Sequence, residues 1–104
     1  MGPEAKIEAY LKKRVLETGG RIRKLSWPGH RGAPDRMVWW PRRRDVPGFP
    51  APPEVVFVEV KAPGKKATKQ QQREHAKLRR DDFYVKVVDS LEAVDAFVEG
   101  DALS

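Results

Sequence analysis

An acidic and a basic side chain lie two residues apart near the end of an apolar run. Glu59 and Lys61 follow Val55-Val56-Phe57-Val58 and precede the chain-breaking pair Pro63-Gly64. Residues two apart on a strand share one face, so this carboxylate and this ammonium should emerge side by side. A rigid strand that ends in two charged side chains is a common support for a functional site. An ordinary strand end that reaches solvent with a surface Glu–Lys pair has the same pattern.

Asp35 adds a second carboxylate. It follows Gly32-Ala33-Pro34 and begins an earlier candidate strand. If the two strands pair as a hairpin, Asp35 and Glu59 converge near one end of the sheet. Two converging carboxylates form a hard oxygen site suited to Mg²⁺, which can polarise a phosphoryl oxygen and activate a water. Lys61 could then stabilise developing negative charge or orient the water. The alternative for Asp35 is a turn residue after proline.

The elements that must position these residues alternate between helix and strand. Residues 4–18 form the first predicted helix, because Ile7, Leu11 and Val15 recur at four-residue spacing and Gly19-Gly20 ends the pattern. Glu8 falls on the border of this apolar stripe. The other predicted elements are strands over residues 21–26, 35–40, 55–61 and 83–88, a helix from Thr68 to about residue 80, and a last helix that begins at Ser90.

The second and last predicted helices differ in their apolar side chains, and a long insertion separates two of the predicted strands. Ala76 and Leu78 are the expected apolar contacts of the second helix, and the last helix carries four apolar side chains at helical spacing: Leu91, Val94, Phe97 and Val98. Residues 41–53 are rich in proline and arginine, which denies them helix or ladder hydrogen bonding. We expect this stretch to be a long excursion between two paired strands, within a single domain over residues 1–104.

Composition narrows the class of partner. The chain has 104 residues, a net charge of +6 and no cysteine, which excludes disulfides, thiolate metal sites and a cysteine nucleophile. Such a basic balance favours nucleic acid or an anionic membrane surface, although a soluble basic protein without an anionic partner has it too. The longest apolar runs, residues 37–40 and 55–58, are far short of the ~20 residues that span a membrane. With no apolar signal core at the N-terminus, we expect a cytoplasmic protein that does not enter membranes.

Taken together, these motifs resemble the VRR-NUC domain family of the PD-(D/E)xK nuclease superfamily. The residues that carry the resemblance are Gly32-Ala33-Pro34-Asp35, Val58-Glu59-Val60-Lys61-Ala62-Pro63-Gly64, Gln71 and Val87-Val88-Asp89-Ser90. Each motif is weak alone, but their order, spacing and predicted context are specific and cover nearly the whole chain. The resemblance implies a restriction-endonuclease-like α/β fold, in which helices flank a central mixed β-sheet in the order α-β-β-β-α-β-α.

The resemblance also implies a metal-binding centre. Asp35 and Glu59 would bind Mg²⁺, with Mn²⁺ also accepted, and the backbone carbonyl of Val60 would be a third protein ligand. Lys61 would be the catalytic lysine.

Two further catalytic positions follow from the same resemblance. Glu8 matches the acidic residue of the first helix, which supports the water shell of the metal; Glu4, one turn earlier, is its rival. Gln71 matches the glutamine that follows the lysine strand, although the neighbouring Gln70 and Gln72 blur the alignment and an ordinary solvated glutamine is the alternative.

Basic side chains near these motifs are candidate DNA contacts, and solvated loops are the alternative. Backbone amides at a helix start, together with nearby lysines, suit a phosphate. The candidates are His30, Arg31, Arg42, Arg43, Arg44, Lys65, Lys66 and Lys69. His75 is expected to be a surface or packing histidine rather than a ligand. The three tryptophans, Trp27, Trp39 and Trp40, are expected in the core or at a subunit interface rather than stacked on bases.

Several functions are compatible with these motifs. Stand-alone members of the family resemble Holliday junction resolvases, and an enzyme that nicks two symmetric strands is naturally a two-fold homodimer. The alternatives are a flap, nick or general duplex nuclease, and a nucleic-acid-binding module without catalysis. An RNA-binding module is disfavoured, because the chain lacks the aromatic sheet signature of single-strand recognition. The small size of the chain suits a phage or bacterial mobile element.

Overall fold

A four-stranded mixed β-sheet organises the molecule. The computed structural model describes residues 2–41 and 55–101. The strands lie in the order β1-β2-β3-β4, with bounds Arg21–Lys24 (β1), Arg36–Trp39 (β2), Val55–Val60 (β3) and Tyr84–Val88 (β4). Neighbouring strands are antiparallel from β1 to β3, whereas β4 runs parallel to β3. The expected α/β class, the mixed sheet and the element order are confirmed, with strand ends that differ by one or two residues from the predicted ones.

The hairpin predicted between the second and third strands is present. Arg36 on β2 pairs with Val58 on β3, and Trp39 pairs with Val55. Asp35 directly precedes β2, so this antiparallel register carries Asp35 to the position opposite Glu59. The parallel pair β3–β4 needs a crossover connection, which helix α2 (Lys69–Arg80) supplies.

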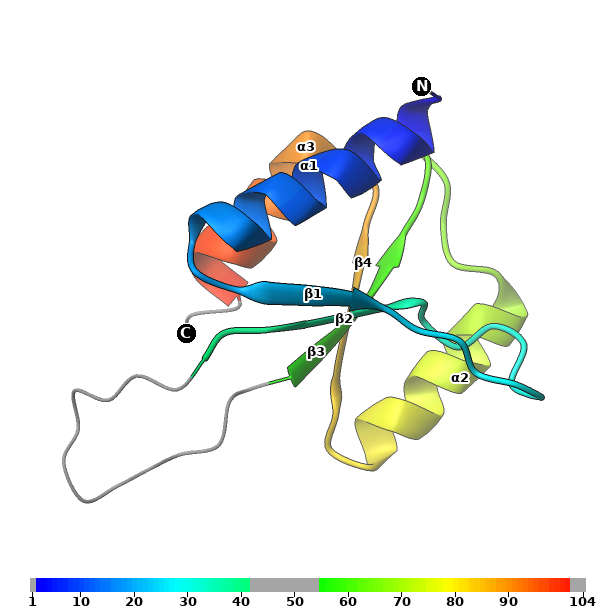
Figure 1. The fold of residues 1–104 in the computed structure, drawn as a ribbon. Helices are drawn as coiled ribbons and strands as arrows, with labels where there is room; N and C mark the ends of the chain where they lie inside the picture. The colour runs from blue at the N-terminus through cyan, green and yellow to red at the C-terminus, as the bar shows by residue number, and fades with distance from the viewer. Residues whose placement is uncertain (1, 42–54, 102–104) are drawn as a thin grey trace, which may run out of the picture.

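Helices cover the two faces of the sheet (Figure 1). Helix α1 (Pro3–Glu17) and helix α3 (Leu91–Ala96) lie together on one face, and α2 lies on the other. The core forms between the sheet and the first pair of helices, because Ile7, Leu11 and Val15 on α1 are all buried there. On β3, Val56, Val58 and Val60 point into the same core, as the two-residue period predicts.

The second helix begins at the expected cap. The Thr68 hydroxyl accepts a hydrogen bond from the Gln71 backbone N–H at 3.1 Å, and the Gln71 side-chain oxygen accepts one from the Thr68 N–H at 2.9 Å. This reciprocal capping box satisfies two amides that the helix would otherwise leave without partners. The Gln71 side chain is therefore held at the N-terminal end of α2.

Three details of the helices differ from the sequence predictions. Ala76 is exposed, and the buried residue of α2 is His75. Leu91 is 45% exposed, because it occupies the first turn of α3 beyond the core. The last helix is not uniform: after Ala96 the backbone widens into a π-helical segment, Phe97–Asp101. Phe97 and Val98 are nevertheless buried, as the pattern predicts.

The described helices include none with both the length and the apolar character needed to cross a membrane. Residues 42–53 of the proline-rich excursion, with the predicted phosphate contacts Arg42, Arg43 and Arg44, lie outside the described residues.

Candidate active site

The β2–β3 hairpin brings the two predicted metal-binding carboxylates together. Asp35 precedes β2, and Glu59 is the penultimate residue of β3. The Asp35 main chain is fixed, because its carbonyl accepts a hydrogen bond from the Leu25 N–H at 2.9 Å. The Asp35 side chain is 48% exposed, whereas the Glu59 side chain is 11% exposed. One carboxylate therefore faces solvent while the other lies in the protein.

Burial and neighbouring charge act strongly on Glu59. Desolvation and, after it, the negative charge of Asp35 raise the pKa of Glu59 from 4.5 to about 7. Lys61 and Arg36 lower the pKa of Glu59, and Glu4 raises it further, but these are smaller effects. The fold thus holds two carboxylates close enough to repel one another, and this repulsion is relieved by a proton or by a cation.

Lys61 follows Glu59 on the same face, directly after β3. Its backbone N–H donates to the Val88 carbonyl at 2.9 Å, which extends the parallel ladder by one residue. The Val60 side chain is buried in the core between them. Lys61, the Val60 backbone and Glu59 are therefore held on rigid, hydrogen-bonded chain.

The donor set fits a hard, partly hydrated cation. Within residues 2–41 and 55–101, no three His, Asp or Glu side chains are grouped so that they could hold a metal ion by themselves. Asp35 and Glu59 offer two carboxylates, and Val60 offers a backbone oxygen. Mg²⁺ suits such a set, because it keeps several waters and takes one or two carboxylates from the protein.

Arg36 is a component of the site that the sequence analysis missed. Its guanidinium pairs with the Asp35 carboxylate at 3.0 Å and, through its other terminal nitrogen, with the Glu8 carboxylate of α1. The Arg36 side chain is only 10% exposed. A signal was available in the sequence: Arg36 lies two residues before the buried Val38, so the strand period places it on the inner face.

The first helix brings both of its candidate acids to this end of the sheet. Glu8 is half-buried and joins the site through Arg36. Glu4 is exposed, yet its charge acts on Glu59. Residues four apart share one face of a helix, so both acids point the same way. Both Glu4 and Glu8 are therefore placed so that either can be the acidic residue of the first helix.

Gly32 places the loop that leads to Asp35 against the helix that carries Gln71. Gly32 has φ +94°, and a Cβ there would lie 3.1 Å from the backbone carbon and oxygen of Gln70. Only glycine combines this backbone angle with so close an approach. Gln71 is therefore near the Asp35 loop, but the oxygen of its side chain is engaged in the capping box.

His75 lies beneath Glu59 on the second face of the sheet. It is 1% exposed, and its Nε2 is 3.8 Å from Glu59 Oε1. Burial, followed by the positive charges of Arg79 and Lys61, lowers the pKa of His75. A buried neutral histidine agrees with the packing role expected from the sequence, although its contact with Glu59 was not foreseen.

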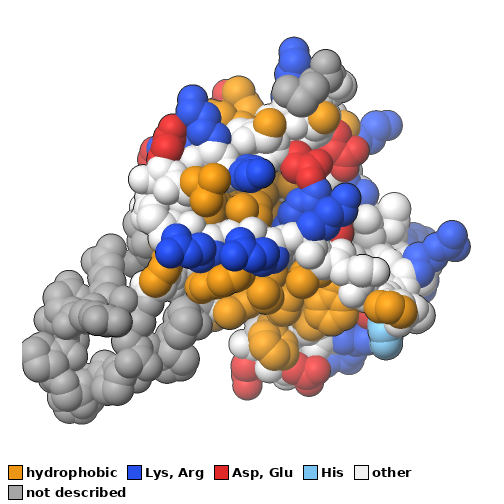
Figure 2. All heavy atoms as spheres, in the orientation of Figure 1, with side chains coloured by type: hydrophobic (Ala, Val, Ile, Leu, Met, Phe, Trp, Pro, Cys, Tyr) orange, Lys and Arg blue, Asp and Glu red, His pale blue; other side chains and the backbone are white. Residues whose placement is uncertain are grey.

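The described basic candidates are all exposed. They are His30 and Arg31 in the loop before Asp35, Lys65 and Lys66 in the loop after β3, and Lys69 at the start of α2. Lysine and arginine side chains also gather over α1 and β1 on the face shown in Figure 2. Next to the first loop, the partly buried Trp27 packs edge-on against Phe57 with ring centroids 5.5 Å apart. This tryptophan has a packing role, as expected.

Known proteins share this fold and sequence. A model of the VRR-NUC domain family matches residues 12–92. The chain is 41% identical over 87 residues to a protein of Acyrthosiphon pisum secondary endosymbiont phage 1, named "Putative nuclease p44"; the match covers 84% of this chain and 83% of the relative. A solved structure described as "VRR_NUC domain" superposes with a TM-score of 0.80 at 36% identity, covering 96% of this chain and 98% of the other. These similarities support a nuclease, and they show that the chain belongs to the VRR-NUC domain family.

Proposed function

We propose that this protein is a Mg²⁺-dependent endonuclease that hydrolyses phosphodiester bonds in DNA. The observation that carries the proposal is the convergence of Asp35 and Glu59 across the β2–β3 hairpin, with Lys61 on the same face as Glu59. Membership of the VRR-NUC family supports the same activity. The raised pKa of Glu59 supports a cation at this place, because a cation would relieve the repulsion between the two carboxylates.

The metal-binding residues and Lys61 have different roles in the proposed hydrolysis. Mg²⁺ held by Asp35, Glu59 and the Val60 carbonyl would supply Lewis acidity to the scissile phosphate and to the attacking water. Lys61 stabilises the negative charge that develops on the phosphate oxygens, or orients the water.

Supporting residues keep these groups in position. Arg36 pairs with the Asp35 carboxylate, and Gln71 stands at the start of α2 beside the Asp35 loop. Glu8, which pairs with Arg36, or Glu4 would support the water shell of the metal. Such support matters because small displacements of catalytic groups are costly in rate.

A non-catalytic DNA-binding module is the second candidate, and the same carboxylates disfavour it. Asp35 and Glu59 repel phosphate unless a cation lies between them, so a protein that only binds DNA gains nothing from them. The positive net charge of the chain serves either function.

We propose four-way Holliday junctions as the substrate and a two-fold homodimer as the active assembly. A resolvase must place two equivalent centres on opposing strands, which two-fold symmetry achieves. Apolar side chains at the β4 edge of the sheet, Phe83, Tyr84 and Val87, are exposed and offer a surface for a second copy. Flap, nick and general duplex cutting are the competing specificities.

One experiment tests both activity and specificity. Labelled four-way junction, flap and linear duplex DNA would be incubated with Mg²⁺, Mn²⁺ or chelator, beside the Asp35→Asn variant. The proposal predicts metal-dependent, paired symmetric nicks on the junction, and none with the variant. Cutting of flap or duplex in preference to the junction would replace the resolvase assignment. Metal-independent binding without any cutting would favour the non-catalytic module. Sedimentation velocity of the free protein tests the dimer.

A further inference from the structure

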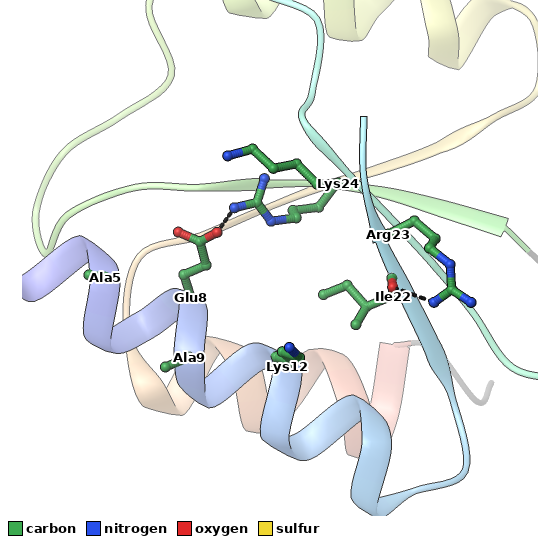
Figure 3. A pocket seen from close by; sticks show the side chains of 8 residues that line it. Ala5, Glu8, Ala9, Lys12, Ile22, Arg23 and Lys24 are labelled. Atoms are coloured by element: carbon green, nitrogen blue, oxygen red, sulfur yellow. Dashed lines mark hydrogen bonds and ion pairs between the residues drawn. The ribbon is translucent and has the colours of Figure 1, made fainter. Parts of the chain in front are cut away.

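A basic groove lies between helix α1 and the edge strand β1. Its volume is about 460 Å³. Ala5 and Ala9 on the helix and Ile22 on the strand form apolar parts of its wall, and the small alanines leave space that larger side chains would fill. Figure 3 shows the helix on one side and β1 on the other, with the Glu8–Arg36 ion pair between them.

Two lysines give this groove positive charge that no acidic side chain of the described residues neutralises. Lys12 comes from α1 and Lys24 from β1, and Lys24 reaches toward the helix (Figure 3). Both are exposed, and neither forms an ion pair with another residue in the described parts of the chain. Arg23 contributes less, because its side chain turns away from the groove and donates to the Ile22 carbonyl at 2.8 Å.

The positive charge of Lys24 lies opposite another positive charge on the neighbouring strand. Lys24 is the direct partner of Arg36 in the β1–β2 register. Like charges directly opposite one another destabilise a sheet. Arg36 is neutralised by Glu8 and Asp35, but Lys24 has no such partner among the described residues. An anion in the groove would supply it.

The groove is linked to the candidate active site through Arg36, which lines the groove and pairs with Asp35. Glu4, Glu8 and Lys12 follow one another at four-residue spacing on one face of α1, about 6 Å apart along the helix axis. Glu4 acts on the charge of Glu59, and Glu8 contacts Arg36, which also holds Asp35. Along this face, the acidic Glu4 and Glu8 are thus followed by Lys12, and both Glu8 and Lys12 line the groove.

We infer that the groove between α1 and β1 binds backbone phosphates of the DNA substrate, through Lys12 and Lys24, next to the phosphate that is cut. The inference rests on the proposed nuclease function. The proposed DNA contacts then include two surfaces. One is formed by the loops around Asp35 and the start of α2, and the other is the groove, which lies beyond Arg36 as seen from Asp35. The apolar wall suits the sugar edges of the strand, while the two ammonium groups suit its phosphates.

Salt-dependent binding tests the groove without relying on cleavage. Labelled duplex and junction DNA would be titrated by fluorescence anisotropy in chelator, over a series of salt concentrations. The variant Lys12→Ala/Lys24→Ala should reduce the slope of log K against log salt by about 2, because each phosphate contact contributes about 0.9. The matched control is Lys13→Ala/Lys77→Ala, which removes the same charge from exposed positions outside the groove. Its slope should stay unchanged.

A second variant removes space instead of charge. Ala9 is exposed and lines the groove, so Ala9→Leu should narrow it while leaving the helix intact. We expect weaker DNA binding with an unaltered thermal midpoint. An unchanged slope in the double lysine variant, or an equal loss in its control, would overturn the groove assignment even if metal-dependent cutting is normal. Failure of the unaltered protein to bind DNA would overturn both the groove and the nuclease proposal.

Discussion

His75 Nε2 lies 3.8 Å from Glu59 Oε1, and this buried nitrogen has no hydrogen-bond partner in the described structure. The side chain behind the Glu59 carboxylate is therefore an imidazole, which is polar, and not solvent or an aliphatic side chain. Because burial lowers the pKa of His75, the imidazole stays neutral in the folded protein at neutral pH. The pair links the stability of the fold to the acid–base state of the site.

The lowered pKa of His75 predicts a loss of stability in acid. The unfolded histidine takes up a proton near pH 6.5, whereas the folded one does so only at lower pH, so the unfolded state binds more protons as the pH falls. The contribution of His75 to the free energy of unfolding should therefore decrease below about pH 6.5. Urea unfolding at several pH values, in chelator, measures this. His75→Leu should lose that part of the acid slope, and an identical slope in both proteins would contradict the assignment.

The raised pKa of Glu59 predicts the opposite trend without metal. The folded carboxyl keeps its proton to about pH 7, whereas the unfolded one releases it near 4.5. At this group the folded state then binds more protons between these values, so the contribution of Glu59 to stability should fall as the pH rises from about 4.5 through 7. Glu59→Gln should flatten this dependence, and millimolar Mg²⁺ should raise the thermal midpoint of the unaltered protein at pH 8 but not that of the variant. Equal Mg²⁺ stabilisation of both would place the metal elsewhere.

Replacing Arg36 should uncouple α1 from the Asp35 loop. Arg36→Lys keeps the charge but cannot bridge Glu8 and Asp35 with two nitrogens of one planar group. Loss of one charged hydrogen bond should cost about 2 kcal/mol of stability, measured by urea unfolding, and slow cleavage by misplacing Asp35. Glu8→Gln retains a hydrogen-bond acceptor, so it should lower the free energy of unfolding by less than Arg36→Lys does. Wild-type stability and rate in Arg36→Lys would show that the bridge is incidental.

Gly32 and Gly29 offer a matched pair in one loop. Both have positive φ, +94° and +78°, but only a Cβ on Gly32 would meet another segment, the Gln70 backbone. Alanine at either position should cost about 1–3 kcal/mol in backbone strain. Gly32→Ala should, in addition, push the Asp35 loop from α2 and slow cleavage. Equal cleavage rates for the two variants would show that the loop–helix contact does not position Asp35.

Much of this architecture follows from patterns that lie close together in the sequence. The four-residue spacing of Ile7, Leu11 and Val15 predicts α1, and Thr68 and Ser90 mark the starts of α2 and α3. The hairpin that joins Asp35 to Glu59 also has a local sign, because two short apolar runs, residues 37–40 and 55–58, follow one another along the chain. These features depend on local periodicity and caps, which single sequences carry well.

Contacts between distant segments could not be predicted in the same way. Arg36 joins Glu8 to Asp35, and His75 reaches Glu59, only after helices and strands have packed. The sequence predicts that α2 packs through Ala76 and Leu78, its two apolar residues, whereas Ala76 is exposed and the buried residue is His75. A helix with so weak an apolar stripe leaves its rotation to tertiary contacts.

The role of Lys61 gives the most direct test of the proposed chemistry. Single-turnover cleavage of junction DNA in Mg²⁺, with protein in excess, should be slowed about 100-fold or more in Lys61→Ala, because an ammonium aimed at developing charge is lost. DNA binding in chelator should remain close to that of the unaltered protein, and Lys77→Ala, on the exposed face of α2, should cut normally. Cleavage by Lys61→Ala at the unaltered rate would contradict the placement of the active site at the end of β3.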